Sequence, residues 1–159
     1  MRTQYMEKLL LLFAVILTVT ACDKDEFETK PQIKIISVSN ATLPRPSTGP
    51  TFSTFLLEFT DKEGDVDSSI VVARQRLNAR STTQVQSEKF IVPEFPDKRQ
   101  GEIELTLSGT IHLSKNFTAL RIPGTADQFE PDTIRVSFVL ADKKGNRSDT
   151  ASTTVYVLR

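Results

Sequence analysis

Apolar and polar residues alternate with a period of two along most of the chain after position 32. The longest run is residues 102–113, in which Ile103, Leu105 and Leu107 are separated by polar side chains. Residues 52–60 and 132–141 show the same alternation. This period is typical of a β-strand with one buried and one wetted face, and no stretch shows the 3.6-residue period of an amphipathic helix.

Turn residues separate these runs and divide the segment into short strands. Pairs such as Gly64-Asp65, Pro123-Gly124 and Gly145-Asn146 mark the turns. We predict strands over residues 32–38, 52–60, 69–77, 84–92, 102–113, 132–141 and 150–158, with 117–122 as an optional eighth. Residues 32–159 are therefore expected to be all-β, a single immunoglobulin- or fibronectin-III-like β-sandwich. The chain has no tryptophan and no cysteine pair, so it lacks the hallmark of antibody domains and the fold is predicted from the pattern alone. A transthyretin-like sandwich is the alternative.

The first residues have the pattern of a secretory signal. Arg2 and Lys8 precede an apolar run, residues 9–21, that is shorter than the roughly 20 residues of a membrane span. It ends in Val19-Thr20-Ala21-Cys22, which resembles the lipobox of bacterial lipoproteins. The resemblance implies that residues 1–21 are a cleaved signal peptide and that lipid on Cys22 attaches the protein to a membrane.

Residues 22–31 are predicted to be a flexible acidic tether. The acidic cluster over residues 23–28 resembles the export signal of surface-exposed lipoproteins of Bacteroidetes, which implies a place on the outer face of the outer membrane. The alternative is an ordinary solvated tether, because charged segments of low hydrophobicity stay disordered whatever their role.

Two segments of the chain also resemble a known domain type. The first is Phe59 to Asp65, and the second is a final hairpin in which Asp142 precedes a Gly145-Asn146 turn and Ser148. Both segments resemble bacterial Ig-like domains of uncharacterised Bacteroidetes lipoproteins. The likeness covers residues 52–67 and 132–158, and it implies a fold rather than an activity.

Charge and composition exclude several functions. Twenty basic and 20 acidic residues give a net charge of +0, and no basic run suggests a nucleic-acid partner. His112 is the only histidine, and the alternation places it on the polar face of its strand as a surface residue. Lipid on Cys22, the only cysteine, would leave a Cys-His pair without a free thiol, and a surface His112 would leave a Ser-His-Asp triad without its base, so we expect no enzyme activity.

The expected function is a non-catalytic, surface-displayed Ig-like module with an unknown protein or glycan partner. One alternative is a glycan-binding accessory lipoprotein of an outer-membrane importer, which would need exposed aromatic platforms. The other is a small hydrolase, which would need a cleft with paired carboxylates.

Two short motifs suggest modification. Asp132-Thr133-Ile134 and Asp149-Thr150-Ala151 resemble the O-glycosylation motif of secreted Bacteroidetes proteins, which would place glycans on Thr133 and Thr150. The alternative is that both motifs simply begin β-strands.

Acidic residues in two loops predict a structural calcium ion. One group follows the strand at 52–60 and the other follows the strand at 132–141, and in an immunoglobulin-type sandwich these loops cluster at one end. Calcium prefers about six to eight oxygen ligands. The candidate ligands are Asp61, Glu63, Asp65, Asp142 and Asn146. The spacing differs from an EF-hand, because Val66 stands where that loop requires glycine. Solvated turn residues are the alternative.

Overall fold

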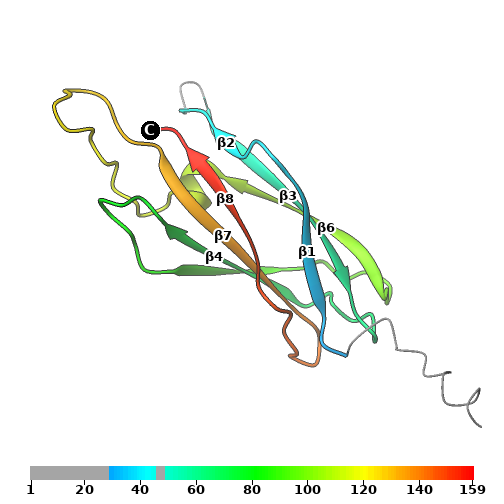
Figure 1. The fold of residues 1–159 in the computed structure, drawn as a ribbon. Coiled ribbons are helices and arrows are strands. Elements are labelled where there is room, and N and C mark those ends of the chain that lie inside the picture. Colours follow the sequence, from blue (N-terminus) through cyan, green and yellow to red (C-terminus); the bar gives the residue numbers. More distant parts are fainter. Residues whose placement is uncertain (1–28, 46–48) are drawn as a thin grey trace, which may run out of the picture.

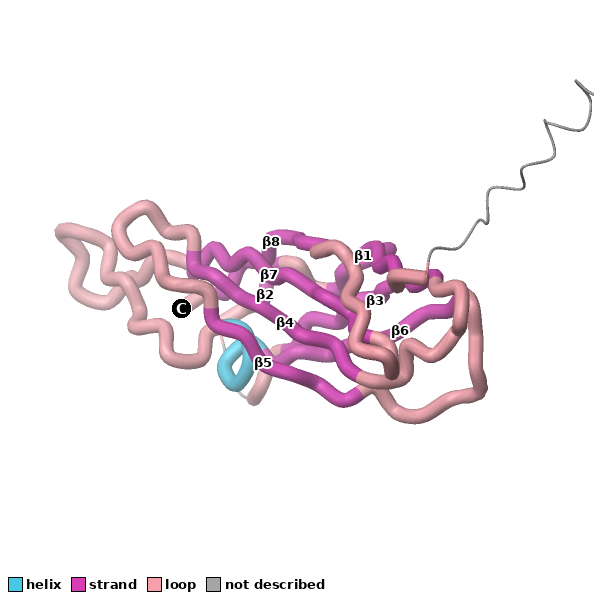
Figure 2. Tube along the Cα trace, turned by 90° about the horizontal axis from the view of Figure 1, so that it is seen from below, coloured by secondary structure: helices cyan, strands magenta, loops and turns pink. Residues whose placement is uncertain are grey.

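The computed structural model describes residues 29–45 and 49–159, which form two β-sheets packed face to face (Figures 1 and 2). The smaller sheet has the strand order β1 (Gln32–Ser39), β3 (Phe52–Thr60), β6 (Gln100–Ser108). The larger sheet has the order β2 (Thr42–Leu43), β8 (Ala151–Val157), β7 (Asp132–Ala141), β4 (Ser69–Arg76), β5 (Gln86–Ile91). All neighbours are antiparallel except β2 and β8, which are parallel. The predicted all-β sandwich is confirmed.

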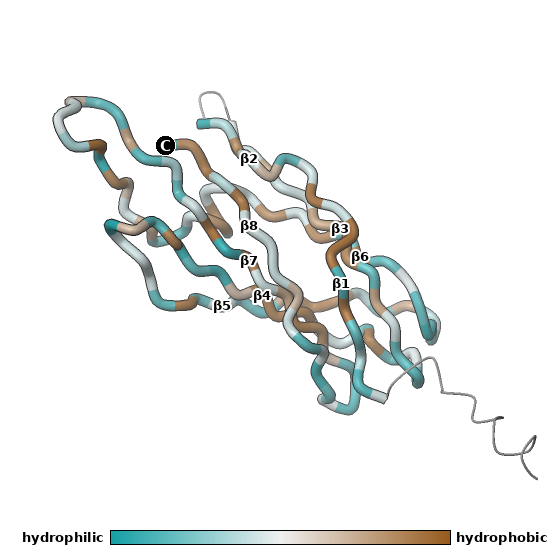
Figure 3. The backbone as a smooth tube through the Cα atoms, in the orientation of Figure 1, coloured by the Kyte–Doolittle hydropathy of each residue, from teal (hydrophilic) through white to brown (hydrophobic). Residues whose placement is uncertain are grey.

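The alternating apolar positions of β3 and β7 meet between the sheets. Phe55 and Leu57 of β3 and Phe138 of β7 are all 0% exposed. The rings of Phe55 and Phe138 lie 5.0 Å apart, a favourable distance for an aromatic pair. Figure 3 shows the apolar positions recurring along the strands, while the loops at the end where β1 begins are mainly hydrophilic. The predicted register of both strands is confirmed.

Strand β1 changes its inward face once, at a β-bulge. Its pairing with β3 shifts between Ile35 and Ser37, which leaves Ile36 unpaired and 43% exposed. Ile33, Ile35 and Val38 can then all pack against the core, although their spacing breaks the period of two.

Two predicted strand segments are wrong. Residues 109–113 form a single π-helical turn, η1 (Gly109–Leu113), in which the Ser114 N–H donates to the Gly109 carbonyl at 2.8 Å. A Cβ on Gly109 would lie 2.9 Å from Thr51 Oγ1, so the chain approaches its neighbour more closely than a side chain allows. Residues 117–122 form a loop with one isolated bridge, Arg121 to Phe129.

The predicted surface position of His112 is also wrong. His112 lies in η1, is half-buried and meets the ring of Phe90 at 5.8 Å. Its Nδ1 accepts from the Ser108 N–H at 2.9 Å, so the imidazole helps to hold the turn.

The sandwich has two distinct ends. At the proximal end, defined as the end where β1 begins, Gln32 pairs with Thr60, and the loops 61–68, 92–99 and 142–150 connect strands. The distal end carries η1 and the long loop 114–131 (Figure 1). Within the described residues, no helix is long and apolar enough to cross a membrane. Residues 1–21, Cys22 and most of the predicted tether lie outside the described residues.

Candidate metal site at the proximal end

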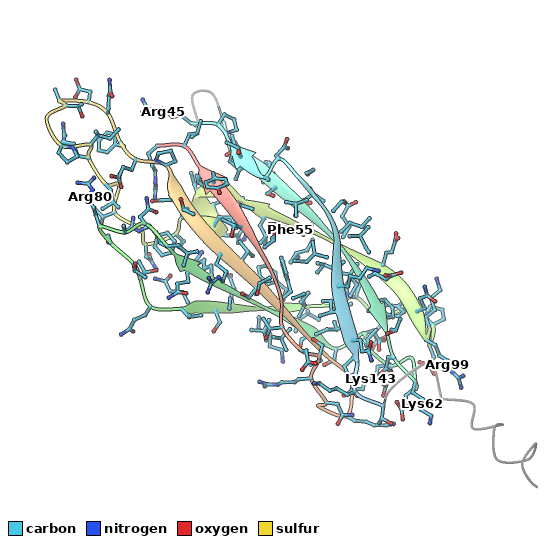
Figure 4. All side chains as sticks on the ribbon, in the orientation of Figure 1. Arg45, Phe55, Lys62, Arg80, Arg99 and Lys143 are labelled. Atoms are coloured by element: carbon cyan, nitrogen blue, oxygen red, sulfur yellow. The ribbon has the colours of Figure 1, made fainter. Side chains whose placement is uncertain are left out.

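The loops after β3 and β7 meet at the proximal end, as predicted. The Lys143 N–H donates to the Asp65 carbonyl at 3.0 Å, which joins loop 142–150 to loop 61–68. The Lys98 N–H donates to the Gly64 carbonyl at 3.0 Å and brings in loop 92–99. In Figure 4, Lys62, Arg99 and Lys143 lie together at this end. The three loops 61–68, 92–99 and 142–150, which are distant in the sequence, thus lie against one another at the proximal end.

Gly64 permits the close contact with loop 92–99. Its φ of +80° lies in the left-handed region, which L side chains rarely adopt. A Cβ at this position would lie 2.8 Å from the backbone nitrogen and carbonyl carbon of Lys98. The Gly64 N–H also donates to Asp61 Oδ2 at 2.7 Å, so the turn fixes one of the acidic side chains.

Three aspartates converge within this region. One carboxylate oxygen from each of Asp61, Asp65 and Asp142 lies within 4.8 Å of the other two. Asp61 is 0% and Asp142 2% exposed, whereas Asp65 is half-buried. Like charges this close repel, and burial reduces the screening that water would supply.

Hydrogen bonds satisfy only part of this cluster. Both oxygens of Asp142 accept from Asn146, Oδ1 from the backbone N–H at 2.7 Å and Oδ2 from the side-chain amide at 2.6 Å. In contrast, Oδ1 of Asp61 and Oδ1 of Asp65 are buried and have no donor among the described residues. A buried acceptor left without a donor costs about 1–3 kcal/mol.

The electrostatics of Asp61 reflect this environment. Burial raises the pKa of the Asp61 carboxyl, and the nearby charges of Asp65 and Glu63 raise it further. The backbone amides of Gly64 and Asp65 act in the opposite direction without cancelling the shift. The charged form of Asp61 is therefore disfavoured where it stands.

Lysines neutralise the acidic residues at the edge of the cluster. Lys143 Nζ lies 3.0 Å from Asp67 Oδ1, and this contact lowers the pKa of Asp67 and raises the pKa of Lys143. Lys144 Nζ lies 3.7 Å from Glu63 Oε1. Lys143 and Lys144 therefore pair with Asp67 and Glu63 rather than with the three central aspartates.

The structure brings together three of the five predicted ligands. Asn146 directs its amide nitrogen at Asp142, so in this arrangement its side chain donates a hydrogen bond to a predicted ligand. Glu63 lies beside the cluster and faces Lys144. Asp67 was missed, although it continues the alternation of Asp61, Glu63 and Asp65 and would have been found by extending that pattern.

The other predicted site residues lie elsewhere. Thr133 is half-buried within β7, and its N–H donates to Asn78 Oδ1 at 2.9 Å. Thr150 is exposed and directly precedes β8. Both motifs therefore stand at the starts of strands, and Thr150 is the more exposed of the two threonines. Cys22 lies outside the described residues.

Comparison with known proteins identifies no relative. No protein-family model matches the chain, and a search of curated protein sequences finds no match.

Proposed function

We propose that this chain is a non-catalytic, lipid-anchored module of the bacterial cell envelope, which presents one end of an immunoglobulin-like sandwich to a partner. The observation that carries the proposal is that the N-terminal entry of the chain and the long loop 114–131 lie at opposite ends of the sandwich. The chain enters the sandwich at the proximal end, whereas loop 114–131 projects from the distal end (Figure 1). An anchor on Cys22 at the outer membrane, with the protein on its outer face, would leave this loop pointing away from the lipid.

The strand order supports the immunoglobulin-like assignment. In such domains the second and fifth strands share one sheet, and the third, sixth and seventh form the other. If the short β2 is counted as part of the first strand, β3 and β6 correspond to the first pair, and β4, β7 and β8 to the second group. The parallel pairing of β2 with β8 means that the N-terminal strand contacts both sheets.

The distal loop is held in one shape, which suits a binding surface. The Glu130 N–H donates to the Leu120 carbonyl at 2.8 Å, and the Ile122 N–H donates to the Gln128 carbonyl at 2.9 Å. Arg80, labelled beside this loop in Figure 4, contacts Glu130 at 2.9 Å. Unstructured loops of this length are uncommon in compact domains and are usually functional or disordered. A preformed loop loses less entropy when it binds.

A buried ion network fixes the base of the same loop. Asp132, 0% exposed, accepts from Arg76 Nη1 at 3.2 Å and from Arg159 Nε at 2.7 Å. The same two arginines donate to the loop backbone, Arg76 to the Thr118 carbonyl at 2.7 Å and Arg159 to the Phe117 carbonyl at 2.9 Å. The loop is thus joined to β4, β7 and the C-terminal residue.

The geometry favours this function over a hydrolase. Three surface hollows of about 230–260 Å³ lie near the proximal end, and each is lined by a single carboxylate: Glu102, Glu58 or Asp149. Glu58 and Glu102 are cross-strand partners, but alternation places them on the outer face of a sheet rather than in a cleft. The hydrogen bond from Lys34 lowers the pKa of Glu58, the opposite of what a general acid needs.

The geometry also favours this function over glycan binding by an aromatic platform. Phe52 and Tyr156 are the aromatic residues among the exposed large apolar side chains of the described structure. Phe52 alternates with inward residues of β3 and Tyr156 with inward residues of β8, so the two rings lie on the outer faces of different sheets. They do not form a shared surface for a sugar.

The proposal is tested by cross-linking intact cells with a membrane-impermeable reagent and identifying the captured partners. The matched variant replaces residues 122–128 with a short Gly-Ser turn, since Arg121 and Phe129 already pair across the loop. We expect a specific partner with the wild-type chain and its loss with the shortened loop, at an unchanged melting temperature. Identical capture by both proteins, or no labelling of either on intact cells, would contradict the proposal.

A further inference from the structure

We infer that Asp61, Asp65 and Asp142 bind one calcium ion that joins the loops of the proximal end. This site goes beyond the proposed function and is independent of it, because a structural cation would hold these loops whatever partner the distal end binds.

The convergence of the carboxylates is the first observation. Their oxygens lie within 4.8 Å of one another, which a single central cation of Ca²⁺–O distance about 2.3–2.6 Å can span. Asp61 and Asp65 come from one loop and Asp142 from another. Two loops from different parts of the chain therefore supply ligands to the same point.

The unpaired buried oxygens are a second, independent observation. Asp61 is 0% exposed, yet its Oδ1 has no donor among the described residues, and the same is true of the buried Oδ1 of Asp65. Buried polar groups are nearly always satisfied, and a buried acceptor without a protein donor calls for a bound water or ion. Two exceptions within one cluster of like charges favour a cation over water, because water cannot neutralise the repulsion.

The donor set selects the class of metal. The three converging groups are carboxylates, with neither imidazole nor thiolate, and oxygen ligands of this kind suit hard cations such as calcium and magnesium. Three carboxylates can supply up to six oxygens when bidentate, and calcium accepts such variable, crowded geometry. Magnesium demands near-ideal octahedral coordination and gives up its water reluctantly. Calcium is the better fit.

The surroundings of the cluster are arranged around these three residues. Gly64 donates to Oδ2 of Asp61, and Asn146 donates to both oxygens of Asp142, which fixes both side chains in place. Lys143 and Lys144 direct their charges to Asp67 and Glu63, which lie beside the three aspartates. The ion would therefore complete a prepared site and stiffen the junction with β1.

The test measures calcium binding by the full chain purified in mild detergent. After removal of metal with EDTA, equilibrium dialysis against CaCl₂ should give one bound ion with a dissociation constant on the order of 0.1–1 mM, typical of extracellular modules. At 10 mM calcium the melting temperature should rise by about 5–10 °C. The same concentration of MgCl₂ should give less than about a third of that rise.

Matched variants separate a metal site from a structural acidic cluster. Asp65→Asn, at the half-exposed position, should weaken calcium binding at least tenfold, and the double variant Asp61→Asn, Asp65→Asn should abolish it. In EDTA the double variant should melt no lower than the wild type, because the repelling charges are gone. Asp149→Asn removes one charge at the same end but outside the cluster, and it should bind calcium normally.

Three results would overturn the inference. The first is a wild-type chain that binds no calcium up to 10 mM. The second is an Asp65→Asn variant that binds as tightly as Asp149→Asn. The third is a magnesium response equal to that of calcium.

Discussion

At the scale of single residues, inward positions of β3 and β7 should dominate stability. Phe138 and Leu57 are both 0% exposed, so each truncation to alanine leaves a cavity in the core. We expect Phe138→Ala to lower the free energy of unfolding by about 3–5 kcal/mol and Leu57→Ala by about 2–5 kcal/mol. Denaturant titration monitored by circular dichroism measures both losses.

Leu56 provides the control for this prediction. It neighbours Leu57 on the same strand but points to the outer face and is only half-buried. Leu56→Ala should therefore cost clearly less than Leu57→Ala. Equal losses at the two positions would mean that the sheets do not bury alternate faces of β3 as described.

At the scale of elements, the network around Asp132 joins β4 and β7 to the distal loop. Asp132→Asn keeps the shape of the side chain but leaves Arg76, 4% exposed at its side chain, without its charge partner. We expect a loss of about 3–5 kcal/mol in unfolding free energy, because a buried charge is left uncompensated. Backbone amides of loop 114–131 should also exchange with solvent faster.

An exposed ion pair gives the comparison for this element. Lys34 Nζ lies 2.6 Å from Glu58 Oε2 on the outer face of the smaller sheet, and its side chain is 67% exposed. Lys34→Gln should have a much smaller effect on stability, since water screens surface pairs. If Asp132→Asn proved as mild as Lys34→Gln and left exchange of the loop unchanged, the network would not hold the loop.

The alternation of apolar and polar residues predicted some secondary-structure elements correctly and failed for others. The strands β3 and β7 keep a strict period of two and were predicted with their observed bounds. Residues 109–113 have the same apolar period, yet they form η1, at whose start Gly109 lies too close to Thr51 and Leu43 for a side chain. Strand β2 has only two residues and is defined by its pairing with β8, so no alternating pattern in the sequence predicts it.

At the scale of the whole molecule, the proposed lipid anchor on Cys22 would decide where the sandwich works. We predict that Cys22→Ser prevents lipid attachment, so that the protein moves from the detergent phase to the aqueous phase in phase-partition experiments. The physical reason is that acyl chains contribute about 0.8 kcal/mol per buried methylene, and no helix of the described residues could cross a membrane instead. Immunoblots of both phases measure the change, and wild-type partitioning by the variant would refute lipid anchoring.

The sequence by itself determined the features that depend on local order along the chain. The period of two and the turn residues specify a sheet protein, since alternate side chains must point to opposite faces. The acidic loops and the sequence before Cys22 were also visible without a structure, because each is a contiguous motif. These observations were sufficient for the all-β class, for the register of the central strands and for the choice of candidate ligands.

Tertiary structure decided what depends on residues distant in the chain. Asp61 and Asp142 are 81 positions apart, and only the packing of the two sheets shows that their oxygens converge while Glu63 and Asn146 take other partners. The buried network of Arg76, Asp132 and Arg159 is likewise formed by three separate segments. A charged residue looks the same in a sequence whether it is solvated or buried. Its environment, and hence its chemistry, exists only after the strands have assembled.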